Sequence, residues 1–241
     1  MSASSSSDQP PPPNLRFVDI GINLTDPVYT GVYHGKKAHD DDLADVVARA
    51  KAVGCTKMLV TASDLESAKR ASEVAGMFPG TCYTTIGIHP CSTSQIPHPA
   101  SAHLTALLHL AQTLLSTPSP PLLAFGELGL DYDRLHLSPR PTQLQYFTAQ
   151  LDIAAQVGLP LFLHSRAAHA DFVGALAGVL DRLPRRGVVH SFTGTREEML
   201  ELVGMGFDVG VNGCSMKTPE NAAVVRDIPL ERIQLETDGP W

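Results

Sequence analysis

The sequence has few cysteines and lacks both long apolar runs and an excess of basic residues. Its four cysteines are scattered, without the C-x-x-C pair that would indicate a thiolate zinc site, and no export signal precedes them. They are therefore expected to be reduced thiols, in a nuclear or cytoplasmic protein and not a secreted one. No apolar run approaches the roughly 18 residues that a membrane-spanning helix needs, so no membrane segment is predicted.

The charge balance excludes one way of binding nucleic acid. The 18 Lys and Arg residues against 25 Asp and Glu residues give a formal net charge of −7, which argues against a broad basic surface that holds duplex DNA nonspecifically. An anionic substrate would have to be held locally, by a bound divalent cation and a few cationic side chains. Hydrophobic residues make up 43% of the chain and charged residues 18%, as in ordinary globular proteins. No obligate protein partner is predicted.

The chain divides into a short tail and one domain. Residues 1–14 are rich in serine and then in proline, and are expected to be disordered. Residues 15–241 are expected to form a single α/β domain, in which eight short apolar runs alternate with longer helical patterns. The runs are residues 16–24, 57–62, 83–88, 122–126, 159–163, 187–189, 207–211 and 232–236.

Near-continuous apolar strands separated by helices are typical of a buried parallel sheet. Eight of them in strict alternation favour a closed (β/α)8 barrel over an open doubly wound sheet. The chain ends at Trp241, just after the eighth run, so the barrel is expected to lack a final covering helix and to be incomplete at its C-terminal end.

Polar side chains follow several predicted strands, at the end where a barrel carries its catalytic groups. Strands four, five, six and eight are followed by Glu127, His164, His190 and Asp238. Each has an ordinary explanation, because a histidine there is often a hydrogen-bonded structural residue and a carboxylate often caps the next helix. Four such residues together favour a divalent metal site, and the absence of cysteine from the set favours zinc, manganese or magnesium.

Other polar residues near the same end are candidates for substrate contacts. Asn23 follows the first strand and His89 the third, where substrate contact is slightly favoured over packing. Arg166 lies two residues after His164 and could bind a phosphate or pair with a carboxylate; the two are about equally supported. Lys217, six residues beyond the seventh strand, is a weaker candidate for contact with an anionic substrate.

Seven ordered motifs between about residues 17 and 241 resemble the TatD family of metal-dependent deoxyribonucleases, in particular its eukaryotic branch. The motifs are VDIGINLTD, TIGIHP, FGELGLDYDR, LFLHSR, VVHSFTG, NGCSMKT and ETDGPW. The resemblance implies a (β/α)8 barrel, a DNA substrate and a centre of one or two metal ions. It also implies that Glu127 bridges the two metals, that His164 and His190 are imidazole ligands, that Asp238 is the late aspartate of the centre, and that His89 lies at the substrate-facing edge.

The opening motif departs from the pattern of this family. Many members carry D-x-H-x-H, whereas residues 19–23 read DIGIN, so Gly21 offers no side-chain ligand and Asn23 offers only a neutral amide oxygen. One metal would keep the bridging carboxylate and both imidazoles. The other would be left with Glu127, Asp238 and Asn23, a weak oxygen-rich site that magnesium could occupy together with water.

Three functions are compatible with these residues. The first is a deoxyribonuclease that attacks phosphorus with a metal-activated water, with Asp238 as proton acceptor, and acts as an exonuclease on single-stranded ends because a barrel mouth is narrow. The second is a metal-dependent hydrolase of amide or ester bonds on the same barrel. The third is a catalytically weak binding protein, suggested by Gly21 and Asn23. Arg166 and Lys217 favour the phosphodiester substrate.

Overall fold

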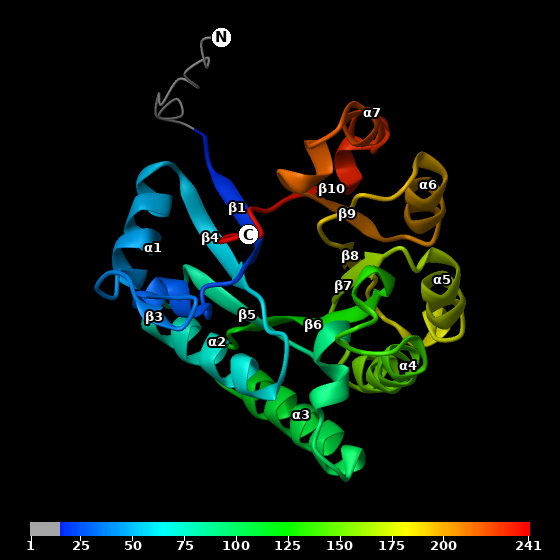
Figure 1. Cartoon of the computed structure of the whole chain (residues 1–241), viewed down its shortest axis with the longest axis horizontal. Coiled ribbons are helices and arrows are strands. Elements are labelled where there is room, and N and C mark those ends of the chain that lie inside the picture. Colours follow the sequence, from blue (N-terminus) through cyan, green and yellow to red (C-terminus); the bar gives the residue numbers. More distant parts are fainter. Residues whose placement is uncertain (1–14) are drawn as a thin grey trace.

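Eight parallel strands form one sheet at the centre of the molecule (Figure 1), a computed structural model that describes residues 15–241. The predicted disordered tail, residues 1–14, lies outside the described residues. The strand order β1-β4-β5-β6-β7-β8-β9-β10 follows the chain, as a singly wound barrel requires. The strands are β1 (Phe17–Ile22), β4 (Cys55–Val60), β5 (Cys82–Ile86), β6 (Leu122–Asp131), β7 (Leu161–Arg166), β8 (Gly187–Val189), β9 (Asp208–Val211) and β10 (Ile233–Leu235).

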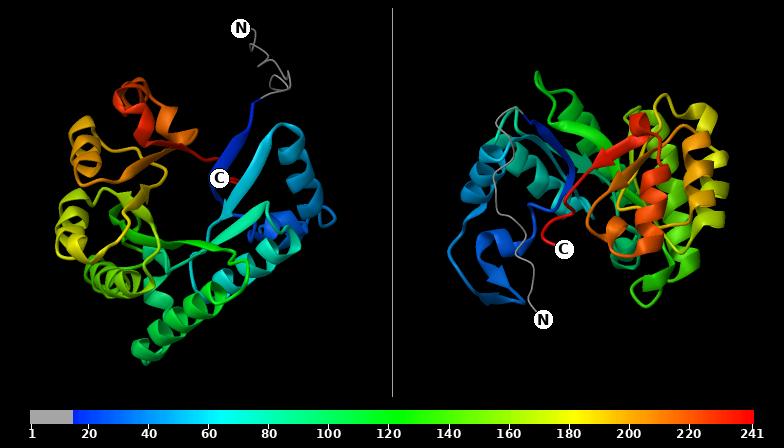
Figure 2. Two further views of the ribbon diagram at one scale, coloured as in Figure 1. Left: turned by 180° about the vertical axis from the view of Figure 1, so that it is seen from behind. Right: turned by 90° about the horizontal axis from the view of Figure 1, so that it is seen from above.

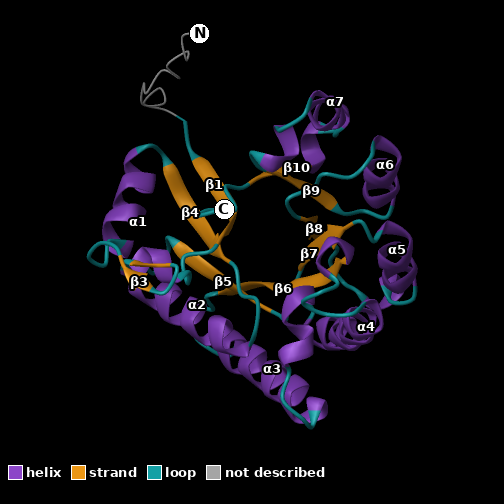
Figure 3. Ribbon diagram, viewed as in Figure 1, coloured by secondary structure: helices purple, strands orange, loops and turns teal. Residues whose placement is uncertain are grey.

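Seven α-helices of the described residues lie outside the ring of strands (Figure 3). They are α1 (Leu43–Ala52), α2 (Leu65–Met77), α3 (Ala100–Leu115), α4 (Arg140–Val157), α5 (His169–Ala177), α6 (Arg196–Gly204) and α7 (Pro219–Asp227). The predicted barrel of alternating strands and helices is therefore confirmed, and no helix follows β10 among residues 15–241. Within the same residues, no helix combines the length and apolar character needed to span a bilayer.

The two ends of the strand order meet through the segment that follows β10 (Figure 2). The Asp238 N–H donates to the Gly21 carbonyl at 2.8 Å, and the Asn23 N–H donates to the Gly239 carbonyl at 2.8 Å. These two bonds connect the C-terminal end of β1 with the segment that follows β10, and so join the first and last strands of the described residues.

Side chains between the strands and the helices form most of the core. The large residues Phe125, Phe147 and Phe172 are fully buried there, and the rings of Phe147 and Phe172 stack at 5.3 Å. Burial of each such ring contributes about 1.5–3 kcal/mol. The apolar runs of the sequence are thus explained by strands that are covered on both faces.

Two strands extend further than their apolar runs indicated. The prediction that Glu127 and His164 follow their strands was wrong, because β6 continues to Asp131 and β7 continues to Arg166. The pairing of these strands shifts register between Gly126 and Leu128, so Glu127 lies in an irregular part of β6. Polar side chains are tolerated inside these strands because they face one another in the barrel.

A small hairpin in the connection from β1 to α1 was not predicted. Strands β2 (Val32–Tyr33) and β3 (Lys36–Lys37) pair antiparallel across a turn in which His34 and Gly35 have positive φ. Strands of two residues are too short to show an alternating pattern, so no hydrophobic periodicity indicated them.

Candidate metal centre

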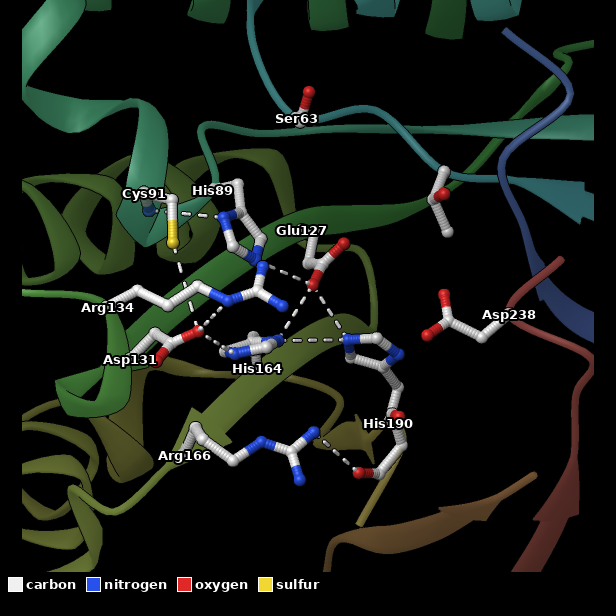
Figure 4. Close-up of polar contacts among 12 residues, drawn as sticks. Ser63, His89, Cys91, Glu127, Asp131, Arg134, His164, Arg166, His190 and Asp238 are labelled. Atoms are coloured by element: carbon white, nitrogen blue, oxygen red, sulfur yellow. Dashed lines mark hydrogen bonds and ion pairs between the residues drawn. The ribbon is translucent and has the colours of Figure 1, made fainter. Parts of the chain in front are cut away.

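The Glu127 carboxylate lies where three imidazole rings meet (Figure 4). Its Oε1 atom is 2.7 Å from His190 Nε2, 3.0 Å from His164 Nδ1 and 3.3 Å from His89 Nε2. Glu127 comes from β6 and His164 from β7, while His89 and His190 follow β5 and β8. The four side chains are between 4% and 13% exposed, so neighbouring strands of the barrel deliver a nearly buried polar cluster to one mouth.

The spacing of three of these atoms fits a divalent ion. His164 Nδ1 and His190 Nε2 are 3.3 Å apart, and both lie within 3.0 Å of Glu127 Oε1. Two ligand atoms of a tetrahedral ion, at about 2.0–2.1 Å from the metal, lie roughly 3.3 Å from each other. One carboxylate oxygen and two imidazole nitrogens are a donor set that suits borderline ions such as zinc.

The residues behind two of the rings give them opposite polarity toward Glu127. His164 Nε2 is 3.2 Å from the buried Asp131 Oδ2, so this carboxylate would hold a proton on Nε2 and leave the Nδ1 lone pair for an ion beside Glu127. His89 Nδ1 instead accepts the Cys91 N–H at 3.1 Å, so its Nε2–H donates to Glu127. Although His89, Glu127 and His164 lie close enough to hold one ion, His89 is oriented as a hydrogen-bond donor.

Electrostatics keep the central carboxylate ionised. Burial acts to raise the pKa of Glu127, but the charges of His190 and His89 outweigh it and hold this pKa well below its usual range. Burial likewise acts to lower the pKa of His89, and the charge of Glu127 outweighs it and raises this pKa. Glu127 is therefore available as an anionic ligand, and His89 retains its donor character.

Asp238 approaches the cluster from the segment after β10, with its carboxylate directed toward Glu127 and His190 (Figure 4). Asn23 Nδ2 donates to Asp238 Oδ1 at 3.1 Å, while Asn23 Oδ1 accepts the Thr61 hydroxyl at 2.6 Å. The structure therefore places Asn23 as a support for Asp238. Burial raises the pKa of Asp238, which makes this carboxylate a better proton acceptor.

The two predicted basic residues differ in their surroundings. The Arg166 guanidinium donates to the Thr193 hydroxyl and to the Ser191 carbonyl, and it pairs with no carboxylate of the described residues. It lines a cavity of about 530 Å³ that opens beside the cluster, between the start of α5 and the loop that leads to α6. Lys217 is exposed and does not line this cavity.

Sequence reasoning did not single out Glu236. Its side chain is fully buried, accepts the Ser191 N–H on Oε1, and places Oε2 3.4 Å from His190 Nδ1. A glutamate directly after the last strand, two residues before Asp238, was the available signal.

Comparisons with known proteins agree with this geometry. The family model described as TatD related DNase matches residues 18–241. The chain is 48% identical over 235 residues to the deoxyribonuclease Tat-D of Schizosaccharomyces pombe, covering 95% of this chain and 73% of that protein. It is 37% identical over 228 residues to the 3'-5' ssDNA/RNA exonuclease TatD of Edwardsiella piscicida, covering 93% and 80%.

A solved structure shows the same fold. The crystal structure of a hydrolase TatD family protein from Entamoeba histolytica superimposes with a TM-score of 0.86 at 35% sequence identity. The match covers 94% of this chain and 74% of that chain.

Proposed function

The chain belongs to the TatD family of DNases, and on this premise we propose that it hydrolyses phosphodiester bonds of DNA with a divalent metal. The observation that carries the proposal is the cluster of Glu127, His164 and His190, whose ligand atoms lie 2.7–3.3 Å from one another. This arrangement favours an enzyme over a binding protein, because the donors are already spaced for an ion and the proton acceptor stands beside them.

The chain's own residues account for the other requirements of phosphodiester hydrolysis. Glu127, His164 and His190 would hold the ion, whose chemistry in such sites is to acidify a water and to polarise a phosphoryl oxygen. Asp238 would take the proton of the attacking water, since burial raises its pKa and Asn23 fixes its orientation.

His89 and Arg166 would hold the non-bridging oxygens. His89 would turn its Nε2–H from Glu127 to the substrate, and Arg166 lines the neighbouring cavity and pairs with no carboxylate of the described residues. Such donors bind phosphate oxygens through charge-assisted hydrogen bonds. Lys217 would at most contact the DNA backbone outside this cavity.

The shape and charge of the protein favour a single-stranded end as substrate. The cavity of about 530 Å³ that Arg166 lines is of the size that holds one small ligand, although the metal-binding residues themselves do not line it. The net charge of −7 also disfavours nonspecific binding along a duplex. The name of the Edwardsiella piscicida protein suggests removal of nucleotides from a 3' end, with RNA as a further substrate.

We further propose that the centre binds one ion tightly and a second weakly. Glu127 and Asp238 would remain for the second ion, because Gly21 has no side chain and the Asn23 amide oxygen is engaged by Thr61. Zinc or manganese would suit the nitrogen-containing site, and magnesium the oxygen-rich one.

An assay with end-labelled oligonucleotides tests the proposed activity. Single-stranded DNA, duplex DNA and RNA, labelled at either end, are incubated with the protein in magnesium, manganese or zinc, and the products are resolved by length. We expect stepwise shortening of single-stranded DNA that requires metal and is stopped by EDTA. The Glu127→Gln variant, which loses the ionised ligand while keeping its size, should show no shortening.

Each other result identifies an alternative. Folded protein that binds metal but leaves every nucleic acid intact would refute the phosphodiesterase and direct attention to amide and ester substrates. Protein that binds no metal in a titration would refute both hydrolases and leave a binding protein.

Replacement of Arg166 by lysine should weaken substrate binding more than catalysis. The variant keeps the charge but loses the planar fork that can hold two phosphate oxygens, so we expect KM for a single-stranded oligonucleotide to rise about tenfold with kcat nearly unchanged. Steady-state kinetics measure both constants. Arg182→Lys is the matched control, because Arg182 is exposed and pairs with Asp152 away from the centre. An equal rise of KM in both variants would contradict a phosphate contact by Arg166.

A further inference from the structure

Two buried polar atoms face each other behind His190. His190 Nδ1 and Glu236 Oε2 are 3.4 Å apart, and each lacks a hydrogen-bond partner of good geometry. They are the buried side-chain atoms with this property among the described residues. A buried charge or ring nitrogen without a partner is costly, so a small rotation that joins these two atoms satisfies both.

The Glu236 carboxylate is held in place from its other side. Its Oε1 accepts the N–H of Ser191, the residue that follows His190, so the same carboxylate contacts the backbone and the ring of one short segment. Its side chain is fully buried, so water does not compete for Oε2. The other oxygen, Oε2, therefore faces His190 Nδ1 and can accept a hydrogen bond from it.

Two glycines leave the room that this carboxylate occupies. A Cβ atom at Gly21 of β1 would lie 2.5 Å from Glu236 Oε2, and a Cβ atom at Gly210 of β9 would lie 3.1 Å from Oε1. Any larger residue at position 21 would therefore displace the oxygen that faces His190. The absence of a side chain at Gly21 thus leaves space for the Glu236 carboxylate inside the barrel.

The other imidazole of the cluster has the same support. Asp131 Oδ2 lies 3.2 Å from His164 Nε2, so each of the two rings has a carboxylate behind the nitrogen that faces away from Glu127. His89 has a backbone N–H in this place and presents the opposite polarity. A carboxylate behind an imidazole fixes which nitrogen keeps its lone pair and makes that nitrogen a better ligand.

We infer that Glu236 is a positioning residue for His190 and that Gly21 makes room for it. Glu236 accepts the Nδ1–H of His190, so the ring would keep its Nε2 lone pair for an ion held beside Glu127. This inference rests on the metal centre of the proposed function, and it assigns to the first and last strands a part in holding one ligand.

Metal affinity and ring protonation together test the inference. Zinc is titrated in competition with a chelator into the wild-type protein, Glu236→Gln and Gly21→Ala, and we expect affinity to fall 10- to 100-fold in both variants. Gly174→Ala is the control, because a Cβ atom there meets nothing within 4 Å. Circular dichroism and thermal melting establish that each variant is folded, and Gly21→Ala keeps Glu236 itself should Glu236→Gln fail to fold.

The protonation of the ring gives a readout that a packing defect would not move. In zinc-loaded protein with 15N-labelled histidine, wild-type His190 should show a protected Nδ1–H and a metal-bound Nε2, and Glu236→Gln should lose this protection. Unchanged zinc affinity in both variants, with an unchanged His190 resonance, would overturn the inference. Zinc binding by a wild-type protein that cleaves no DNA would refute the nuclease and leave this inference standing. A wild-type protein that binds none of zinc, manganese and magnesium would refute both.

Discussion

His164→Ala should lower the rate of DNA hydrolysis by roughly 10³-fold and remove the tightly bound ion. The substitution deletes the Nδ1 ligand atom that lies 3.0 Å from Glu127 Oε1 and 3.3 Å from His190 Nε2. It also leaves the buried Asp131 carboxylate without its imidazole partner, so added metal should restore little activity. Initial rates on a single-stranded oligonucleotide and the metal content of the purified protein are the two measurements.

A histidine on an outer helix is the control for the His164→Ala variant. His109 lies on α3, away from the cluster, and His109→Ala should keep both its metal content and its rate. An H164A protein that retained its metal and more than about a tenth of the wild-type rate would contradict the placement of His164 among the ligands.

Gly129→Ala should be strongly destabilising. Gly129 lies in β6 with a φ of 149°, and a Cβ atom there would overlap the carbonyl oxygen of His164 on the neighbouring β7. The unfavourable φ and the steric overlap together are expected to lower the free energy of unfolding by about 3–5 kcal/mol. The melting temperature should fall by roughly 10 °C for a protein of this size.

Thermal and urea denaturation measure this effect, with Gly204→Ala as the matched change. Gly204 ends α6, and a Cβ atom there meets nothing within 4 Å, so this variant should melt close to the wild type. If Gly129→Ala melted at the same temperature as Gly204→Ala, the result would contradict the close approach of β6 to β7 at Gly129.

The barrel could be predicted because its elements carry local signals. Each strand is a short apolar run. Helix starts also have local signals: Thr195 forms a capping box with Glu198, and Thr218 caps a helix that begins with proline. The ends of β6 and β7 were missed because both strands continue through polar residues that are buried only in the assembled barrel.

The members of the cluster were predictable, but the orientation of their rings was not. Three consecutive strands of the barrel, β6, β7 and β8, bring Glu127, His164 and His190 to one mouth. Which nitrogen of each ring faces Glu127 depends on carboxylates distant in sequence, and Glu236 looked like the end of a buried strand. Spacing along the chain carries no information on such contacts.

The centre depends on contacts between opposite ends of the described chain, and this has a consequence for the order of folding. Asn23 and Asp238 are 215 positions apart, yet the hydrogen bond between their side chains orients the proposed proton acceptor. Contacts of such large sequence separation form late, because they require closure of the largest loop in the chain. A polypeptide still emerging from the ribosome would already contain the imidazole ligands while lacking the carboxylate that completes the chemistry, so hydrolytic competence would be gained only after the last strand has been released and docked.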